Sequence, residues 1–345
     1  MKSKVFISGI GWMMGQKKDA DRNCVFIEKE QYEYIISNIN HKSIDRISKI
    51  CLATAKMALV DSKTEQNSIE EECSLFLGTM YGPLNSIHEF DSVSVNKGAL
   101  YVNPGLFPNT VLNSPACQTG IHYKLSKPIY TISNGITSAL DAVGLGYLHI
   151  AGNLCPAALT GGVDEIPNIQ MASKRFDKLL IESCGFIVLQ NKKPTDRWRR
   201  FVEVIGYDSF VNANEISEKV CNEITKRLSG ILKHEGAEIF QIKELRIYSS
   251  LPKDCLKQIC IKIWEDCGIG VRSINTSVDL MGAGSLFQIY CSYLENTQRC
   301  YIEDKQDDFI PTCGRTGLKS LMVMLSIDES KISMLVLKMD PVSVE

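Results

Sequence analysis

Segments typical of β-strands and segments typical of α-helices alternate along almost the whole chain. Short runs rich in β-branched and aromatic residues are followed by longer stretches in which apolar residues recur at helical spacing. This alternation predicts an α/β protein whose strands are joined by helical connections. Strands are expected at Val5–Ser8, Ser74–Leu77, Ile129–Ile132, Ala157–Thr160, Phe186–Gln190, Arg246–Ser249, Arg272–Asn275, Leu321–Ile327 and Ile332–Leu337. Helices are expected at Ile44–Ser62, Thr137–Ala151, Glu215–His234, Leu256–Cys267 and Gly284–Glu295.

The composition fits one large globular unit or two fused domains. The chain has 345 residues, of which 44% are hydrophobic and 23% are charged, and its formal net charge is -2. A near-neutral charge gives no electrostatic reason to expect nucleic acid or an anionic membrane as a partner. The longest apolar runs are too short to span a bilayer. The N-terminal sequence MKSKVFISGIGWMMG predicts a first strand entering a glycine turn, because its apolar run is too short for a signal peptide.

The cysteine usage predicts a cytoplasmic protein without disulfides. The chain contains 13 cysteines, spread from Cys24 to Cys313, and no C-x-x-C pair that would match the spacing of zinc ligands. An odd number of cysteines in a chain without a signal peptide indicates reduced, mostly buried thiols. The stretch ISGIGWMMG lacks one glycine of the dinucleotide-binding pattern. We therefore expect neither a metal nor a cofactor.

Two parts of the chain look like variants of one unit. TISNGITSALDAVGLGY and SINTSVDLMGAGSLFQIY both read as a strand, a polar turn and a glycine-containing helix, and FIVLQNKK and LMVMLSIDE both read as late strands. The charged stretch Asn191 to Arg200 is the best internal boundary. It could dock an acidic carrier protein, although a solvated turn is the simpler interpretation. The predicted domains are residues 1–195 and 196–345.

The stretch YTISNGITSALDAVG, from Tyr130 to Gly144, predicts a strand, a tight turn and a helix. Enzymes often mount a nucleophile on such a turn, because it exposes one side chain beside a helix N-terminus. Here the most obvious candidate position holds Ile136, and no cysteine is close by in the sequence. An isoleucine side chain can act neither as a nucleophile nor as an acid.

These segments, in this order, resemble the β-ketoacyl synthases of the thiolase fold over nearly the whole chain. VFISGIGWMMG is similar to their opening strand and glycine turn, and FLGTMYGPLNSIHEF to the strand and glycines after their first long helix. FPNTVLNSPACQTGIHYKLSKPIYTIS is similar to the segment before the nucleophile loop, and AALTGGVDEI to the strand and double glycine after the nucleophile helix. The resemblance implies a thiolase-like fold, with two similar α/β halves in a layered αβαβα arrangement.

The resemblance also implies that the catalytic residues are missing. The family uses a cysteine to hold an acyl thioester and two histidines that assist decarboxylation and stabilise an enolate. In this chain the matching positions hold Ile136, Ser250 and Asp279. A carboxylate at the last position would repel an enolate. Cys313 to Gly317 (CGRTG) stands in place of the C-terminal gating loop. No catalytic residue is expected, and condensing chemistry is predicted to be absent.

One subgroup of the family fits this pattern: the chain-length factors, or ketosynthase β subunits, of type II polyketide synthases that make aromatic or polyene products. These subunits keep the fold, lack the cysteine and pair with an active ketosynthase, although their usual residue at the cysteine position is glutamine. The resemblance implies a heterodimer with an active ketosynthase, served by an acyl carrier protein with its phosphopantetheine-bound chain. In thiolase-fold dimers the strand before the nucleophile loop pairs with its two-fold mate.

The segment before that strand is expected to help wall the partner's acyl pocket and so to set chain length. Small residues there would leave room for a growing chain and bulky residues would close the pocket, at about 1–3 kcal/mol per excluded methylene. On this hypothesis Gly120→Phe shortens the product, while Ile136 fills the empty catalytic site. Ordinary core packing is an equally reasonable role for Cys117. The expected wall consists of Phe107, Leu112, Asn113, Ser114, Ala116, Cys117, Thr119, Gly120 and Ile121.

Two alternative functions stay open at this point. The chain could be an enzyme with altered chemistry on acyl or malonyl thioesters, a hydrolase or a decarboxylase. Such an enzyme would use Ser250 with Asp279, or the amides of Asn134 and Asn275 near an enolate oxygen. The chain could instead be a free-standing scaffold that binds acyl carrier protein as a homodimer. The product, its length, the starter unit and the identity of the partner are not encoded in any motif that we find.

Several other conspicuous residues are expected to be structural. The carboxylate pair Asp164-Glu165 follows two glycines and is expected to cap a segment or to bond backbone amides. Cys184 is expected to be a small buried residue. His122 and His149 have no partners at ligand spacing and are expected on the surface or in satisfied core positions.

Overall fold

Strands and helices alternate in the structure, a computed structural model, as the sequence predicts. The second asparagine of the two polar turns, Asn275, and the glycine-rich stretch Cys313–Gly317 lie outside the residues that it describes. Those residues are 2–19, 23–38, 43–64, 66–167, 178–194, 201–211, 218–273, 278–296 and 320–339.

Ten strands form one large sheet, made of two groups of five that meet at its centre. The strands β1 and β9, the first of each group, pair antiparallel, with Val5 opposite Val204. The first group consists of β1 (Val5–Met14), β4 (Cys73–Gly78), β5 (Ile129–Ile132), β6 (Ala157–Asp164) and β8 (Ser183–Gln190). The second group consists of β9 (Val202–Val211), β10 (Ile242–Ser249), β11 (Gly270–Ser273), β13 (Ser320–Ile327) and β14 (Lys331–Met339).

The two groups repeat the same strand order. From the centre outward the order is β1-β8-β6-β4-β5 in one group and β9-β14-β13-β10-β11 in the other, with the same parallel and antiparallel pairings. The predicted match between TISNG and SINTS agrees with this repeat, because β5 and β11 are each third in the chain order of their group. The predicted match between FIVLQNKK and LMVMLSIDE is wrong, because β8 is a fifth strand and β13 a fourth. The boundary between residues 195 and 196 stays a prediction.

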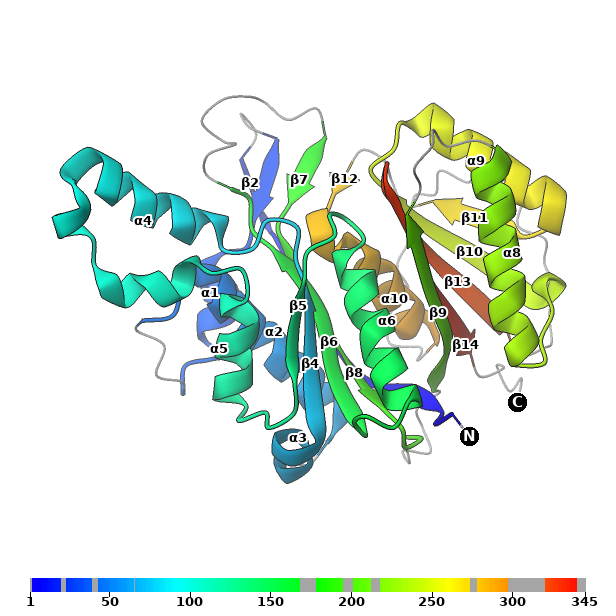
Figure 1. Cartoon of the computed structure of the whole chain (residues 1–345), viewed down its shortest axis with the longest axis horizontal. Helices are drawn as coiled ribbons and strands as arrows, with labels where there is room; N and C mark the ends of the chain where they lie inside the picture. The colour runs from blue at the N-terminus through cyan, green and yellow to red at the C-terminus, as the bar shows by residue number, and fades with distance from the viewer. Residues whose placement is uncertain are drawn as a thin grey trace.

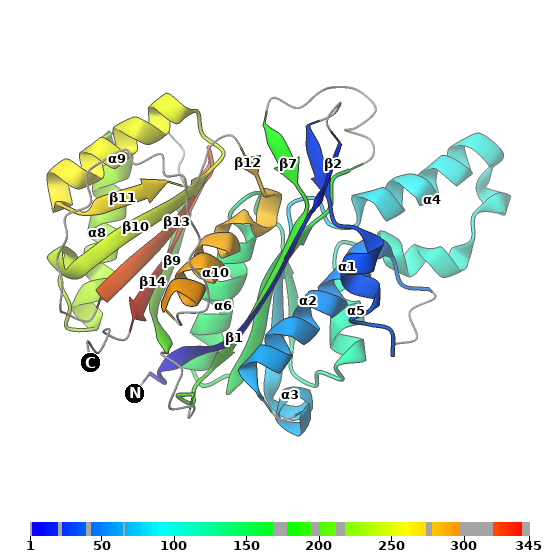
Figure 2. The same ribbon diagram turned by 180° about the vertical axis from the view of Figure 1, so that it is seen from behind.

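Helices form three layers around the two groups of strands, which confirms the predicted αβαβα arrangement (Figures 1 and 2). The helices α2 (Arg46–Ser62) and α5 (Ser114–His122) cover the outer face of the first group. The helices α6 (Ser138–Ala151) and α10 (Gly284–Asn296) lie between the groups and contact strands of both. The helices α8 (Glu218–His234) and α9 (Lys253–Cys267) cover the outer face of the second group.

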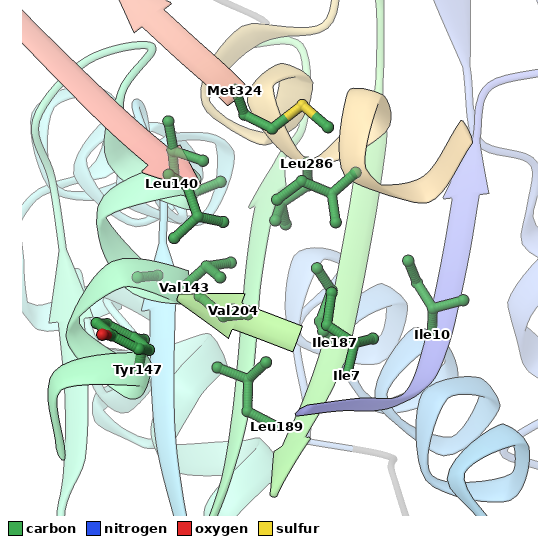
Figure 3. Packing of buried hydrophobic residues seen from close by; sticks show 14 of the residues in the cluster. Ile7, Ile10, Leu140, Val143, Tyr147, Ile187, Leu189, Val204, Leu286 and Met324 are labelled. Atoms are coloured by element: carbon green, nitrogen blue, oxygen red, sulfur yellow. The ribbon is translucent and has the colours of Figure 1, made fainter. Parts of the chain in front are cut away.

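The middle layer is held by apolar packing from both groups of strands. Figure 3 shows Leu140 and Val143 of α6 and Leu286 of α10 packed among strand residues. Those strand residues come from the first group, such as Ile187, and from the second, such as Met324. Each such side chain contributes roughly 1.5–3 kcal/mol when it is fully buried. This core fixes the loop between β5 and α6 relative to the second group of strands.

Several smaller elements complete the molecule. A four-stranded sheet has the order β12-β7-β3-β2. Its strands are β2 (Lys17–Asp19), β3 (Cys24–Phe26), β7 (Leu179–Ile181) and β12 (Val278–Asp279). The short helices are α1 (Lys29–Glu33), α3 (Gln66–Glu72), η3 (Ile239–Gln241) and η4 (Met281–Ala283).

One part of the chain projects from the body and is here called the arm (Figure 1). It comprises α4 (Leu84–Lys97), η1 (Ala99–Tyr101) and η2 (Pro104–Thr110). The sequence analysis did not predict α4, although its apolar residues Leu84, Ile87, Phe90 and Val93 recur every three positions. None of these side chains is buried within this chain.

Candidate functional site

The turn between β5 and α6 carries Ile136, as the sequence predicts. Gly135 has a positive φ of 64°, a conformation that glycine adopts without strain. The Ser138 hydroxyl accepts from the Asn134 N–H at 2.8 Å and lies 2.6 Å from the Gly135 carbonyl, which braces the turn. The Ile136 side chain is only 3% exposed and belongs to the middle-layer core together with Tyr248. Apolar volume therefore fills the predicted nucleophile position.

The carboxylate of Asp141, one turn into α6, holds this loop against the second group of strands. Asp141 is buried and forms an ion pair with Lys331 of β14 at 2.6 Å. It also accepts hydrogen bonds from Asn134 Nδ2 at 2.8 Å and from the Tyr207 hydroxyl at 2.8 Å. The hydroxyls of Thr137 (3.1 Å) and Ser333 (2.5 Å) complete its set of donors. Sequence reasoning missed Asp141, because its partners come from three separate segments: the loop before α6, β9 and β14.

Ser250 and Ile136 lie at the same end of β13. The hydroxyl of Ser326 donates to the Ile136 carbonyl at 3.2 Å, and the N–H of Ser250 donates to the Ile327 carbonyl at 3.3 Å. Ser250 is exposed, and its hydroxyl donates to Asp328 at 2.7 Å. A serine nucleophile needs a base that accepts its proton, usually histidine. In this structure the group that contacts the Ser250 hydroxyl is the carboxylate of Asp328, and not a histidine.

Asp279 contacts Tyr248 near the end of β10, where Tyr248 is buried and Asp279 is partly buried. The Tyr248 hydroxyl lies 3.1 Å from Asp279 Oδ1, and the N–H of Met281 donates to the same oxygen at 2.8 Å. Burial, together with the nearby Asp279 charge, raises the pKa of Tyr248 well above its ordinary value. Tyr248 therefore stays a neutral donor, and Asp279 supports the turn into η4. The contacts of Tyr248 and of the end of β13 bring Ile136, Ser250 and Asp279 into one region of the structure.

Asp164, at the end of β6, bonds backbone amides as predicted. Its carboxylate accepts from the N–H groups of Met80 (2.9 Å), Tyr81 (2.8 Å) and Gly282 (2.9 Å) and from the hydroxyl of Thr79 (2.9 Å). It thereby ties the base of the arm to η4. Burial raises the pKa of Asp164 to about 6, although these four donors oppose the shift.

Glu165, its neighbour, forms an ion pair with Arg46 at the start of α2, so the expected backbone bonding applies to Asp164 alone. Arg46 lies 3.0 Å from Glu165 and 2.6 Å from Glu182, so one guanidinium serves two buried carboxylates. Burial raises the pKa of Glu165 to about 7 in spite of Arg46, and the Glu182 charge adds to the rise.

The described histidines lie away from the three replaced positions. His149 packs edge-on against Phe76 and Tyr130, and His122 packs against Tyr123. Burial lowers the pKa of His149 and of His122, which favours the neutral imidazole. The site therefore has no described imidazole in contact with Ile136, Ser250 or Asp279. Within the described ranges, no group of three or more His, Cys, Asp or Glu could hold a metal ion.

The predicted pocket wall divides into buried and exposed residues. Ser114, Ala116, Thr119 and Gly120 are buried inside this chain, where α5 packs against α2 and β5. An ideal Cβ at Gly120 would lie 2.1 Å from Ile129 Cδ1. Within this chain, the space beside Gly120 is therefore filled by Ile129, and the expectation that the small residues leave room for an acyl chain stays a prediction. Gly120→Phe would act on packing between α5 and β5 before it could act on a pocket.

The remaining members of the predicted wall face outward. Cys117 is half-buried, and Phe107, Leu112, Asn113 and Ile121 are exposed. Phe107, Leu112 and Ile121 belong to a group of exposed apolar side chains in the segment from α4 to β5, here called the apolar set. Its members are Val95, Leu100, Tyr101, Leu106, Phe107, Val111, Leu112, Ile121 and Tyr130.

The prediction that Cys184 is a buried residue is confirmed. Cys184 is buried, and the described cysteines are free thiols. No helix in the described ranges is both long enough and apolar enough to cross a membrane.

Both the sequence and the fold of this chain are similar to those of known proteins. Residues 14–181 match a family model described as Beta-ketoacyl synthase, N-terminal domain. A β-ketoacyl synthase from Burkholderia phymatum STM815 has a TM-score of 0.78 and 14% identity, covering 99% of this chain and 100% of that one. The ishigamide ketosynthase/chain length factor has a TM-score of 0.77 and 15% identity, covering 98% and 99%. A type II PKS acyl-carrier protein in complex with its ketosynthase, AntDE:AntF, has a TM-score of 0.73 and 12% identity, covering 98% and 99%.

Proposed function

Because this chain is a ketosynthase-like protein of the thiolase fold with a β-ketoacyl synthase N-terminal domain, we propose that it is a non-catalytic, chain-length-factor-like partner of an active ketosynthase. Its place would be in type II biosynthesis of an aromatic or polyene polyketide. The observation that carries this proposal is the buried Ile136 at the nucleophile position, with Ser250 and Asp279 engaged in structural contacts.

The edge of the large sheet supports a partner of the same fold. β5 ends the first group of strands, so one side of its backbone has no neighbouring strand in the described part of this chain. Such an edge readily pairs with a strand of another protein. The exposed apolar set lies on the segment that leads to β5, and exposed apolar surface of this kind is typical of protein interfaces.

Phe107, Leu112 and Ile121 would then meet the partner and help shape its acyl pocket. These three side chains are exposed in this chain and bulky enough to limit the length of an acyl chain. The acyl chain would arrive on the phosphopantetheine of an acyl carrier protein bound by the complex. The AntDE:AntF structure is described as a ketosynthase bound to both an acyl-carrier protein and a hexaketide.

The alternative of residual decarboxylation has less support from the geometry. The Asn134 amide nitrogen donates to Asp141 at 2.8 Å, so it already has an acceptor inside the protein. An enolate oxygen would have to compete with a buried carboxylate for that donor. Hydrolysis by Ser250 would require a base other than the Asp328 carboxylate.

Native mass spectrometry after co-expression tests the proposal. The partner should be an active ketosynthase encoded next to this chain, and the expected result is a stable one-to-one heterodimer. Substituting Leu112 or Ile121 by alanine in that heterodimer should lengthen the product, as read by mass spectrometry of the acyl chains. A homodimer that ignores the ketosynthase would contradict the proposal. Turnover of malonyl thioester by the isolated chain would favour the enzymatic alternative.

A further inference from the structure

A groove of about 900 Å³ lies between the arm and the body, apart from the site described above. Its walls come from α4 and from the segment between Val102 and Asn109, and its floor comes from the start of α2 and the carboxylates Glu165 and Glu182. The volume is that of ligand sites, which span roughly 300–1,000 Å³. One side of α4 lines the groove, and Asn85 and Ser86 at its start are bonded to Ile166 and Asp45 of the body.

The charges in the groove favour a cationic ligand group. The carboxylates of Asp45, Glu89, Glu165 and Glu182 line it, whereas the arginine and lysine residues there are Arg46 and Lys97. The Arg46 guanidinium is already shared by Glu165 and Glu182. A concave surface with an excess of one charge attracts the opposite charge.

Two asparagines of the arm offer the donor and acceptor that one secondary amide requires. Asn109 is buried, and its Nδ2 donates to the Ser43 carbonyl at 3.0 Å. Asn103 accepts the Gly105 N–H on its Oδ1 at 2.9 Å. Within the described residues, this leaves Oδ1 of Asn109 and Nδ2 of Asn103 without a partner. The N–H of a secondary amide can donate to Asn109 Oδ1, and its carbonyl can accept from Asn103 Nδ2.

From these observations we propose that the groove binds an extended peptide segment of another protein, carrying one basic side chain toward the acidic floor. The aromatic side chains of Phe26 and Phe90, with Leu106, provide apolar contacts for neighbouring peptide residues. A phosphopantetheine arm shares the secondary amides, but its phosphate would meet the excess of carboxylates. The groove shares Leu106 with the apolar set, but its charged residues and its two asparagines lie outside that set, so this inference does not depend on the proposed function.

Selection from a phage-displayed library of random peptides tests this inference on the full chain. Peptides of roughly nine residues suffice, since an extended peptide spans about 3.3 Å per residue. We expect enriched sequences to share a lysine or arginine at one position. The best peptide, labelled with fluorescein, should bind about tenfold more weakly by anisotropy when that lysine is replaced by norleucine. Absence of any enriched sequence would overturn the proposal.

Variants of the groove distinguish the ligand classes. Glu89 is exposed on α4, so Glu89→Gln should leave folding intact while weakening the lysine peptide several-fold and the norleucine peptide not at all. Asn109→Ala should weaken both peptides, with thermal unfolding as its folding check. Glu329→Gln, on the exposed turn between β13 and β14, is the matched control. Binding that Glu89→Gln does not change would refute the cationic contact. Displacement of the peptide by free 4′-phosphopantetheine, or by a second copy of the chain, would refute the proposed occupant.

Discussion

The hydroxyl of Tyr248 lies 3.1 Å from the carboxylate of Asp279 and joins the end of β10 to the turn before η4. The N–H of Leu280 donates to the same hydroxyl at 3.1 Å. An ideal Cβ at Gly284 would lie 2.1 Å from Tyr248 Cζ, so the tyrosine ring occupies the space above the start of α10. This pair gives Asp279, at which no catalytic role was expected, a structural contact.

Restoring the cysteine should not restore chemistry. In Ile136→Cys the thiol would take a position that is 3% exposed, with no described imidazole beside it. Burial without a basic partner raises a thiol pKa and suppresses the thiolate. We expect no acyl adduct when the variant is incubated with an acyl thioester, as measured by intact-protein mass spectrometry. An adduct mapped to residue 136 would show that the site is still accessible and reactive.

Neutralising Asp141 should destabilise the protein strongly. Asp141→Asn removes the buried charge that pairs with Lys331 and leaves one acceptor oxygen, so Oδ1 can still serve Tyr207 and Ser333 while the donors on Oδ2 meet an NH2 group. Breaking a buried ion pair from one side costs about 3–5 kcal/mol. The free energy of unfolding in urea measures this loss. Glu329→Gln, an exposed control, should stay within about 0.5 kcal/mol of wild type. A similar value for Asp141→Asn would mean that the network contributes little.

The buried carboxyl of Glu165 should make stability fall as pH rises from about 4.5 to about 7. Its pKa is raised from 4.5 to about 7, so in this window the folded state holds a proton that the unfolded state releases. At about 1.4 kcal/mol per pKa unit, the effect is up to roughly 3 kcal/mol. Glu165→Gln should flatten the dependence, measured by urea unfolding at several pH values. A smaller dependence of stability on pH should remain in Glu165→Gln, because the pKa of Asp164 is also raised, to about 6. An equal slope in wild type and variant would contradict this assignment.

Contact between α5 and β5 should appear as coupling between Gly120 and Ile129. Gly120→Ala places a Cβ against Ile129 Cδ1 and should cost about 1–3 kcal/mol by overpacking. Ile129→Val removes that methyl and alone should cost about 0.5–1.5 kcal/mol. The double variant should lose less than the sum of the two, as a double-mutant cycle in urea would show. Strict additivity would place the two residues out of contact.

A charge in the exposed apolar set should weaken the partner complex without unfolding the chain. Ile121 is 71% exposed, so Ile121→Glu should change the free energy of unfolding by less than about 0.5 kcal/mol. Its affinity for the co-expressed ketosynthase should fall at least tenfold by native mass titration. Val60→Glu, on α2, is an equally exposed control and should bind normally. Equal affinities for both variants would place the interface elsewhere.

Much of the fold was predictable, because strand and helix periods are local patterns. The predicted segments around β5, α6, β6 and α10 appear in the structure where the sequence places them. The loss of the nucleophile was also predictable, since the side-chain chemistry of Ile136 is the same in any fold. α4 was not predicted, although Leu84, Ile87, Phe90 and Val93 recur at helical spacing, and none of these side chains is buried within this chain.

The sequence by itself determined the α/β class, the repeated strand–turn–helix units and the absence of a thiol at position 136. Only the tertiary structure decided that Asp141 meets Lys331 and that Asp279 meets Tyr248. It also decided that Gly120 faces Ile129. The physical reason is distance along the chain: a local pattern fixes which face of an element is apolar, but donors and acceptors from separate segments meet only after the layers have packed.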